Sequence, residues 1–148
     1  MRQILILLFT IVALGVNTSV EAKKTKVPKM YIFGMAASFN DTIVHFTNVQ
    51  ELDSAWIDNK NNFLLTRELY SYQLRDFLAN SKQMPRRTCI VVANKNRKKL
   101  EKKFLKMKKI YTKSKDNKQH YDVRFLDDKE FRFKTVKLQD YENVDAQQ

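Results

Sequence analysis

Positive charge gathered between residues 86 and 118 is the chemical feature that dominates this sequence. The segment carries fourteen Lys and Arg against two acids, Glu101 and Asp116, and its net charge of +12 equals the formal net charge of the whole chain. Clustered cations raise the local concentration of a polyanion, and they bind it with an affinity that falls as salt is added. The sequence therefore predicts an electrostatic binding surface, and it favours a non-catalytic protein.

A helix over residues 95–113 would separate these charges from the apolar residues. At about 100° per residue, Leu100, Phe104, Met107 and Tyr111 fall within one narrow arc, which predicts the buried face. The opposite arc is predicted as the binding surface and holds lysines alone: Lys95, Lys98, Lys99, Lys102, Lys106, Lys109 and Lys113.

A second set of residues, Ser38, Asp41, His45 and Cys89, has the side chains that a small hydrolase or transferase would use. Such an enzyme is the alternative function. Ser38 and Asp41 also suit a turn, and His45 alternates with apolar neighbours, which predicts a surface position. Cys89 lies in an apolar run, where cysteine behaves as a small hydrophobe. We favour these structural explanations for all four residues.

The residue types give little support to metal or cofactor chemistry. The chain has two His and one Cys, at spacings that match no structural zinc site. It also has no nucleophile-elbow motif and no phosphate-binding glycine motif. We predict no metal and no cofactor, and the single cysteine excludes a disulfide within the chain.

The N-terminal residues have the pattern of a secretory signal peptide. Arg2 precedes thirteen largely apolar residues, 4–16, and a polar stretch then leads to a small-residue pattern that ends at Ala22. The apolar run is shorter than the ~20 residues that a membrane-spanning helix needs, and an uncleaved anchor is the alternative. We expect removal of residues 1–22 and a periplasmic or secreted protein.

Outside the cytoplasm, the partners that suit a lysine face are acidic glycans, lipopolysaccharide, an anionic membrane surface or another envelope protein. Lys outnumbers Arg by twenty to eight in the chain. Because bidentate Arg suits phosphate recognition better than Lys does, specific nucleic-acid recognition is not expected. A lysine face that is merely solvated, in a chain also rich in Asn and Ile, is the alternative that the sequence leaves open.

Hydrophobic periodicity and turn residues predict seven elements in the rest of the chain. After a polar lead-in at 23–28, strands are predicted at 30–39, 42–47, 89–93, 121–126 and 131–136, and helices at 67–80 and 95–113. The run 89–93 is apolar throughout, which is typical of a strand buried on both faces. Residues 48–58 are ambiguous: Thr47 with Gln50 fits a capped helical turn, and 55–57 fits a short strand.

The order ββαβαββ predicts an α/β fold, a two-layer sandwich in which two helices pack on a mixed sheet of four to five strands. The unit over 88–126 predicts a right-handed crossover between parallel strands, and the first and last strand pairs predict antiparallel pairing. The chain after the leader suits one domain, which we place at 23–137 with a disordered tail at 138–148.

Four segments, YIFGMAASFND at 31–41, DSAWID at 53–58, YSYQLRDF at 70–77 and RTCIVV at 87–92, carry a resemblance. Together they resemble small exported proteins from Bacteroidota-type bacteria, over nearly all of the chain after the leader. The resemblance carries no assigned activity, so it implies no catalytic or ligand-binding residue. It implies an envelope with two membranes and favours the periplasm as the location.

Overall fold

The structure is a computed structural model that describes residues 24–113 and 120–139. Its strands are β1 (Lys24–Val27), β2 (Met30–Ala37), β3 (Ile43–Thr47), β4 (Gln50–Leu52), β5 (Ala55–Asp58), β6 (Thr88–Asn94) and β7 (Asp122–Leu126). Its helices are α2 (Arg67–Ser81) and α3 (Arg97–Thr112). The predicted signal peptide, residues 1–22, and the predicted tail beyond Gln139 lie outside the described residues.

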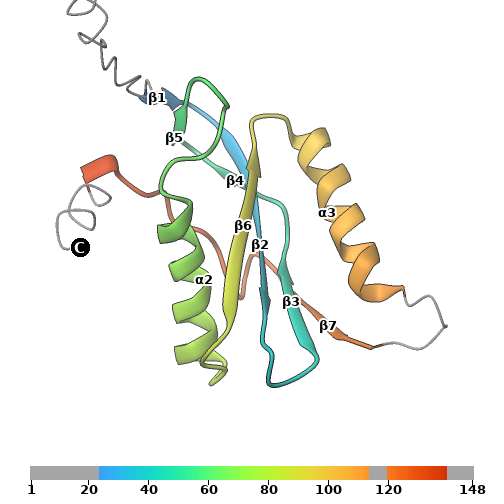
Figure 1. The fold of residues 1–148 in the computed structure, drawn as a ribbon. Coiled ribbons are helices and arrows are strands. Elements are labelled where there is room, and N and C mark those ends of the chain that lie inside the picture. The colour runs from blue at the N-terminus through green and yellow to red at the C-terminus, as the bar shows by residue number, and fades with distance from the viewer. Residues whose placement is uncertain (1–23, 114–119, 140–148) are drawn as a thin grey trace, which may run out of the picture.

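Strand β2 is the strand around which the main sheet is built (Figure 1). Along one edge it pairs antiparallel with β6, from Tyr31 with Asn94 to Ala37 with Thr88. Along its other edge it pairs with β4 in its first half and with β3 in its second half, both antiparallel. Strand β7 joins the far side of β3 in parallel, and β1 and β5 form a separate antiparallel pair.

The two helices pack on opposite faces of this sheet (Figure 1). Alternate residues of β2 serve the two sides, since Ile32 and Ala36 join the core beneath α2, and Phe33 and Met35 join the core beneath α3. Each helix therefore packs on a different face of the same sheet and covers a separate core. The predicted α/β class, with two helices on a mixed sheet of four to five strands, is confirmed.

Two predictions about strand neighbours are wrong. Strands β6 and β7 run parallel, as predicted for a strand–helix–strand unit, but β2 and β3 lie between them. The last strand therefore pairs in parallel with β3 and has no antiparallel partner among the described residues. Strand β6 is an edge strand, and it is not buried on both faces as predicted, because Val91 is its only buried residue and Ile90 is 41% exposed. An apolar run of this length fits either position, so its composition alone does not distinguish them.

The segment before β2 and the ambiguous segment after β3 also form strands. The polar lead-in at 23–28 contains β1, which pairs with β5. The short strand predicted at 55–57 is confirmed by β5, and the alternative of a helical turn at Thr47 and Gln50 is wrong because Gln50 begins β4. Lys and Thr in β1 gain strand structure from pairing, which their own propensity does not reveal.

The strand predicted at 131–136 is absent. Phe131 and Phe133 are buried as the alternation requires, but the alternation then breaks, because Thr135 is exposed and Val136 is buried. Side-chain amides take the place of a neighbouring strand. Gln50 Nε2 donates to Phe131 O at 2.8 Å, and Phe133 N donates to Gln50 Oε1 at 2.9 Å. Gln73 makes the same pair of bonds with the backbone of Lys134, at 2.9 and 2.8 Å.

This glutamine-bonded segment and α2 pack closely over Gly34 in the middle of β2. A Cβ atom at Gly34 would lie 2.7 Å from Leu74 Cδ2 and 3.0 Å from Phe133 Cζ. Such distances require neighbouring atoms to shift. The glycine therefore marks a close approach of α2 to the sheet, one of the two roles that a glycine within a strand indicates.

The two glutamines give a matched test of how the 131–136 segment is held. Gln50→Ala leaves the buried groups Phe131 O and Phe133 N without partners, and it should lower the free energy of unfolding by about 2–4 kcal/mol. Gln73→Ala breaks the same pair of bonds where water can replace them, and it should cost about 1 kcal/mol or less. Urea unfolding measures both values, and equal losses would contradict the assignment of Gln50 as the internal support.

Candidate functional site

Helix α3 presents the predicted lysine face because its apolar arc is docked on an aromatic cluster. Leu100 is fully buried, and the ring of Phe104 lies edge-on to Phe33 at 5.2 Å and to Phe46 at 5.9 Å between centroids. Tyr111 contacts Phe46 edge-on, also at 5.9 Å. The side chain of Asn96 caps the helix by accepting a hydrogen bond from Lys99 N at 3.0 Å. The predicted buried face is confirmed.

All seven lysines of the predicted binding surface are exposed, and we call them the outer arc: Lys95, Lys98, Lys99, Lys102, Lys106, Lys109 and Lys113. Lys95 Nζ donates to Asn62 Oδ1 at 2.7 Å. In the described parts of the chain, the ammonium groups of the other six form no hydrogen bond or ion pair with the protein. These six charges are therefore available to a partner or to water.

The flank of α3 that faces β7 is already engaged by the protein. Arg97 Nε and Glu101 Oε1 form an ion pair at 2.8 Å, and Lys108 Nζ lies 4.6 Å from the ring centroid of Phe125 in β7. Leu105 and Ile110 are 60% and 63% exposed. The charge available to a partner is thus confined to the outer arc and to the opposite flank.

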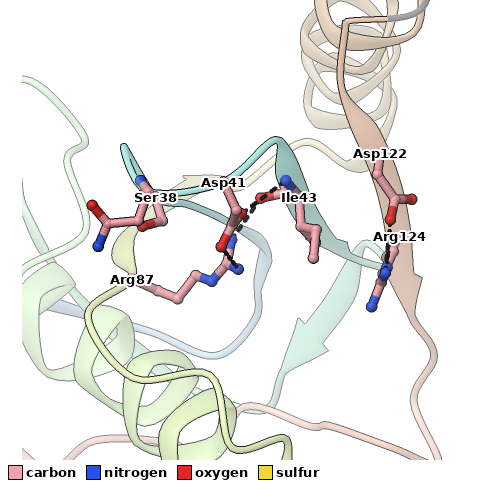
Figure 2. A network of polar contacts seen from close by, with 7 residues as sticks. Ser38, Asp41, Ile43, Arg87, Asp122 and Arg124 are labelled. Atoms are coloured by element: carbon pink, nitrogen blue, oxygen red, sulfur yellow. Dashed lines mark hydrogen bonds and ion pairs between the residues drawn. The ribbon is translucent and has the colours of Figure 1, made fainter.

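Two residues of the alternative enzyme site, Ser38 and Asp41, by contrast help to build the turn between β2 and β3 (Figure 2). Ser38 Oγ accepts a hydrogen bond from Asn40 N at 3.2 Å, and Asp41 Oδ1 accepts one from Ile43 N at 2.9 Å. The bond from Ile43 N, with the nearby Arg87, holds the pKa of Asp41 below its usual value. These are turn-stabilising bonds of the kind that Ser and Asp commonly make.

Arg87 connects this turn to the start of β6, and Figure 2 shows its guanidinium directed at both acceptors. It donates to Asp41 Oδ2 and to Ile43 O, each at 2.6 Å, and its side chain is only 2% exposed. A buried arginine needs such partners, because removing the partner of a buried charge lowers the stability of a protein by ~3–5 kcal/mol. Sequence reasoning counted Arg87 only as one of many cations, and no local signal marks it as structural.

His45 is buried, which corrects the predicted surface position. Its residue is 3% exposed, and the register places it between Ala36 of β2 and Arg124 of β7, on the face that α2 covers. Burial, followed by the charges of Arg87 and Arg124, lowers the pKa of His45. Within the described part of the chain, its Nδ1 atom and Arg87 Nε have no hydrogen-bond partner. The prediction failed because it treated the face opposite Val44 as solvent, whereas that face supports a second helix.

Cys89 lies in the same row of the sheet but is separated from the histidine. Cys89 and His45 both pair with Ala36, from opposite sides, so their Cα atoms are two strand spacings or about 10 Å apart. Burial raises the pKa of the Cys89 thiol to about 11, and the residue packs against the core beneath α2. A thiol with this pKa is protonated at neutral pH and is a poor nucleophile.

The groove beside α3 lies at the end of the sheet opposite to the turn between β2 and β3. It has a volume of about 480 Å³, between the first turns of α3 and the carboxyl ends of β3 and β7, and its lining includes Asn48, Glu101, Leu105 and Asp128. None of the four candidate residues lines it: Ser38 and Asp41 lie in the turn before β3, His45 is in the middle of β3, and Cys89 is near the start of β6. Among the described residues, no group of three or more His, Cys, Asp or Glu could hold a metal ion. The groove and the candidate catalytic residues therefore do not combine into one site.

Comparisons with known proteins give no functional assignment. No protein family, curated protein or solved structure matches the chain. Neither of the described helices is long and apolar enough to cross a membrane. The resemblance to exported bacterial proteins and the predicted export stay predictions.

The burial of His45 predicts a pH-dependent stability. The unfolded chain takes up a proton at His45 below about pH 6.5, but the folded protein resists protonation because the folded pKa is lower. Stability from this residue is therefore complete above that pH and is lost as pH falls toward the folded pKa. Urea unfolding between pH 7.5 and 5 should show this loss, and His45→Gln should remove it. The matched variant of the exposed histidine, His120→Gln, should retain the slope; an unchanged slope in His45→Gln would refute the assignment.

The position of Cys89 predicts slow alkylation in the folded state. Iodoacetamide at pH 7.5 should label the native protein about a hundredfold more slowly than the urea-unfolded protein, because a raised pKa leaves little thiolate. Mass spectrometry over time measures both rates, with Cys89→Ala as the blank. Native labelling as fast as unfolded labelling would restore Cys89 as a candidate nucleophile.

Proposed function

We propose that this protein is a non-catalytic, exported domain that binds an anionic partner through the outer arc of α3. The observation that supports this most directly is the set of six exposed lysine ammonium groups without a protein partner among the described residues. Like charges at i,i+4, such as Lys98 with Lys102, cost about 0.2–0.5 kcal/mol per pair. A bound polyanion would reduce the repulsion between these lysines and release counterions, and both effects favour its binding to α3.

The length of the outer arc favours a repeating or extended anion over a small one. Helix α3 has 16 residues, which corresponds to about 24 Å along its axis. One small anion would contact two or three of the lysines, whereas an acidic glycan, lipopolysaccharide or an anionic membrane surface would contact the whole row. The predicted signal peptide and the resemblance to exported proteins support a location where such partners, or an acidic envelope protein, occur.

The alternative of a hydrolase or transferase has less support. Ser38 and Asp41 are engaged in turn bonds, and Asp41 also binds Arg87. The thiol of Cys89 is protonated at neutral pH, and one strand separates it from His45. None of these groups lines the groove beside α3, the groove beside Ile90 and Val91, or the groove beside Phe77 and Phe131.

Retention on heparin, and binding to vesicles that contain anionic lipid, test the outer arc. Changing Lys98, Lys102, Lys106 and Lys109 to Gln should lower the salt concentration needed for elution. The slope of log affinity against log salt should fall by about three units, because each of the four lost contacts releases roughly 0.7–0.9 counterions fewer.

A matched variant separates the outer arc from net charge. Lys26, Lys60, Lys129 and Lys134 are exposed and lie outside α3, and changing them to Gln removes the same total charge. This variant should retain most of the binding. If the two variants bind equally, the lysines of α3 have no special role, and if the first variant binds like the unmodified protein, the proposed function is wrong.

A further inference from the structure

Strand β6 has one edge without a strand partner in the described part of the chain. It pairs with β2 through all seven of its residues, and no other described strand joins it. No backbone–backbone hydrogen bond from a described turn or loop reaches residues 88–94 either. Figure 1 shows β6 running between α2 and α3, which flank it on the two faces of the sheet.

The composition of β6 leaves this edge open to another strand. Its sequence, Thr-Cys-Ile-Val-Val-Ala-Asn, has no charged residue and no proline. Natural edge strands are commonly protected by charge, proline or short length, and β7 at the opposite edge has five residues that include Asp122 and Arg124. Ile90 on β6 is instead 41% exposed and apolar. The β6 edge therefore lacks the charged side chains that hinder the addition of a strand at the β7 edge.

A surface groove runs beside this edge on the α2 side. It has a volume of about 390 Å³, and its lining includes Ile90 and Val91 of β6 together with Phe63, Arg67 and Ser71. Phe63 is 56% exposed, and Arg67 Cζ lies 5.2 Å from its ring centroid. In strand addition, main-chain bonds supply affinity and pockets beside the edge receive alternate side chains of the added strand. The groove is in a position to receive one such side chain.

Helix α3 supplies the other flank. Arg97, Glu101 and Lys108 occupy the side of α3 that faces β7 and its following loop. At about 100° per residue, the opposite side carries Lys99, Lys103 and Ile110. These side chains therefore extend toward the open edge of β6, and two of them are cationic.

The charges around the open edge favour an acidic occupant. The bases on its flanks and at its ends are Arg67, Arg75, Arg86, Lys95, Lys99 and Lys103. The acids are Asp58, Glu68 and Asp76, and Asp76 is paired with Arg75 at 3.0 Å. A second copy of this chain is disfavoured, because two-fold pairing of β6 with itself would bring the cationic flanks of two α3 helices, each with Lys99 and Lys103, toward each other.

We propose that the open edge of β6 accepts an extended segment of a partner protein that carries carboxylate side chains, which is added to the sheet as a further strand. The added segment would take its backbone hydrogen bonds from β6, place one side chain in the groove at Ile90 and Val91, and direct carboxylates at the flanking bases. This surface adjoins the outer arc of α3, with Lys95 and Lys99 belonging to both, and it extends the proposed function to a second contact.

An acetylated ten-residue peptide that alternates Glu with Val tests the proposal directly. Its addition should slow amide exchange within residues 88–94 of the full chain. An antiparallel or parallel ladder uses alternate amides, so N-methylation of every second peptide residue in one of the two phases should weaken binding about tenfold or more. N-methylation leaves the charge of the peptide unchanged. Equal binding of both N-methylated phases would overturn strand addition, because attraction by charge alone would then account for the complex.

Matched protein variants locate the contact and separate it from the lysine face. Ile90→Asp places a repelling charge on the edge and should abolish peptide binding, while Leu105→Asp, on the far flank of α3, should retain it. The variant with Lys98, Lys102, Lys106 and Lys109 changed to Gln should still show slowed exchange in β6 when the peptide is added. If the amides of β6 already exchange slowly without the peptide, and light scattering shows a dimer, then a second copy of the chain occupies the edge and the proposal is wrong.

Discussion

The docking of one helix onto the aromatic side chains of the sheet is the interaction on which the lysine face depends. Three i,i+4 lysine pairs lie within α3, and together they oppose helix formation by about 0.6–1.5 kcal/mol. Complete burial of Leu100 alone contributes about 1.5–3 kcal/mol, and the contacts of Phe104 with Phe33 and Phe46 add to it. The apolar arc thus stabilises a row of charges that an isolated helix of this sequence would disfavour.

The distribution of polar groups is the reason for which we propose binding rather than catalysis. At the amino ends of β3 and β6, Arg87 binds Asp41 and the backbone of Ile43, so both carboxylate oxygens of Asp41 already accept hydrogen bonds within the turn. The groove at the carboxyl ends of β3 and β7 has acids and apolar groups, but no Ser, His or Cys lines it. Nucleophilic catalysis needs a nucleophile and its base within hydrogen-bond reach of each other, and β2 separates Cys89 from His45.

Local patterns in the sequence predict the features that depend on neighbouring residues of the same segment. The apolar arc of α3, the turn before Ile43 and the exposure of the outer arc all follow from periodicity and turn chemistry. The failures concern partners that are distant in sequence. Residues 131–136 alternate like a strand, yet the side chain of Gln50, about eighty residues earlier, takes the place of the missing neighbour. The burial of His45 and the edge position of β6 likewise depend on how the strands are ordered, which periodicity does not encode.

The two proposed contacts would draw on different kinds of free energy, and their positions make them complementary. Charges on the outer arc act over about 8–10 Å, weaken as salt is added, and chiefly increase the rate of association. Backbone hydrogen bonds along β6 act only on contact, depend little on salt, and chiefly slow dissociation. Because Lys99 belongs to the outer arc and also flanks the β6 edge, the two surfaces are continuous. An acidic chain attracted by α3 would therefore be held beside an open strand that has the length and composition to pair with it.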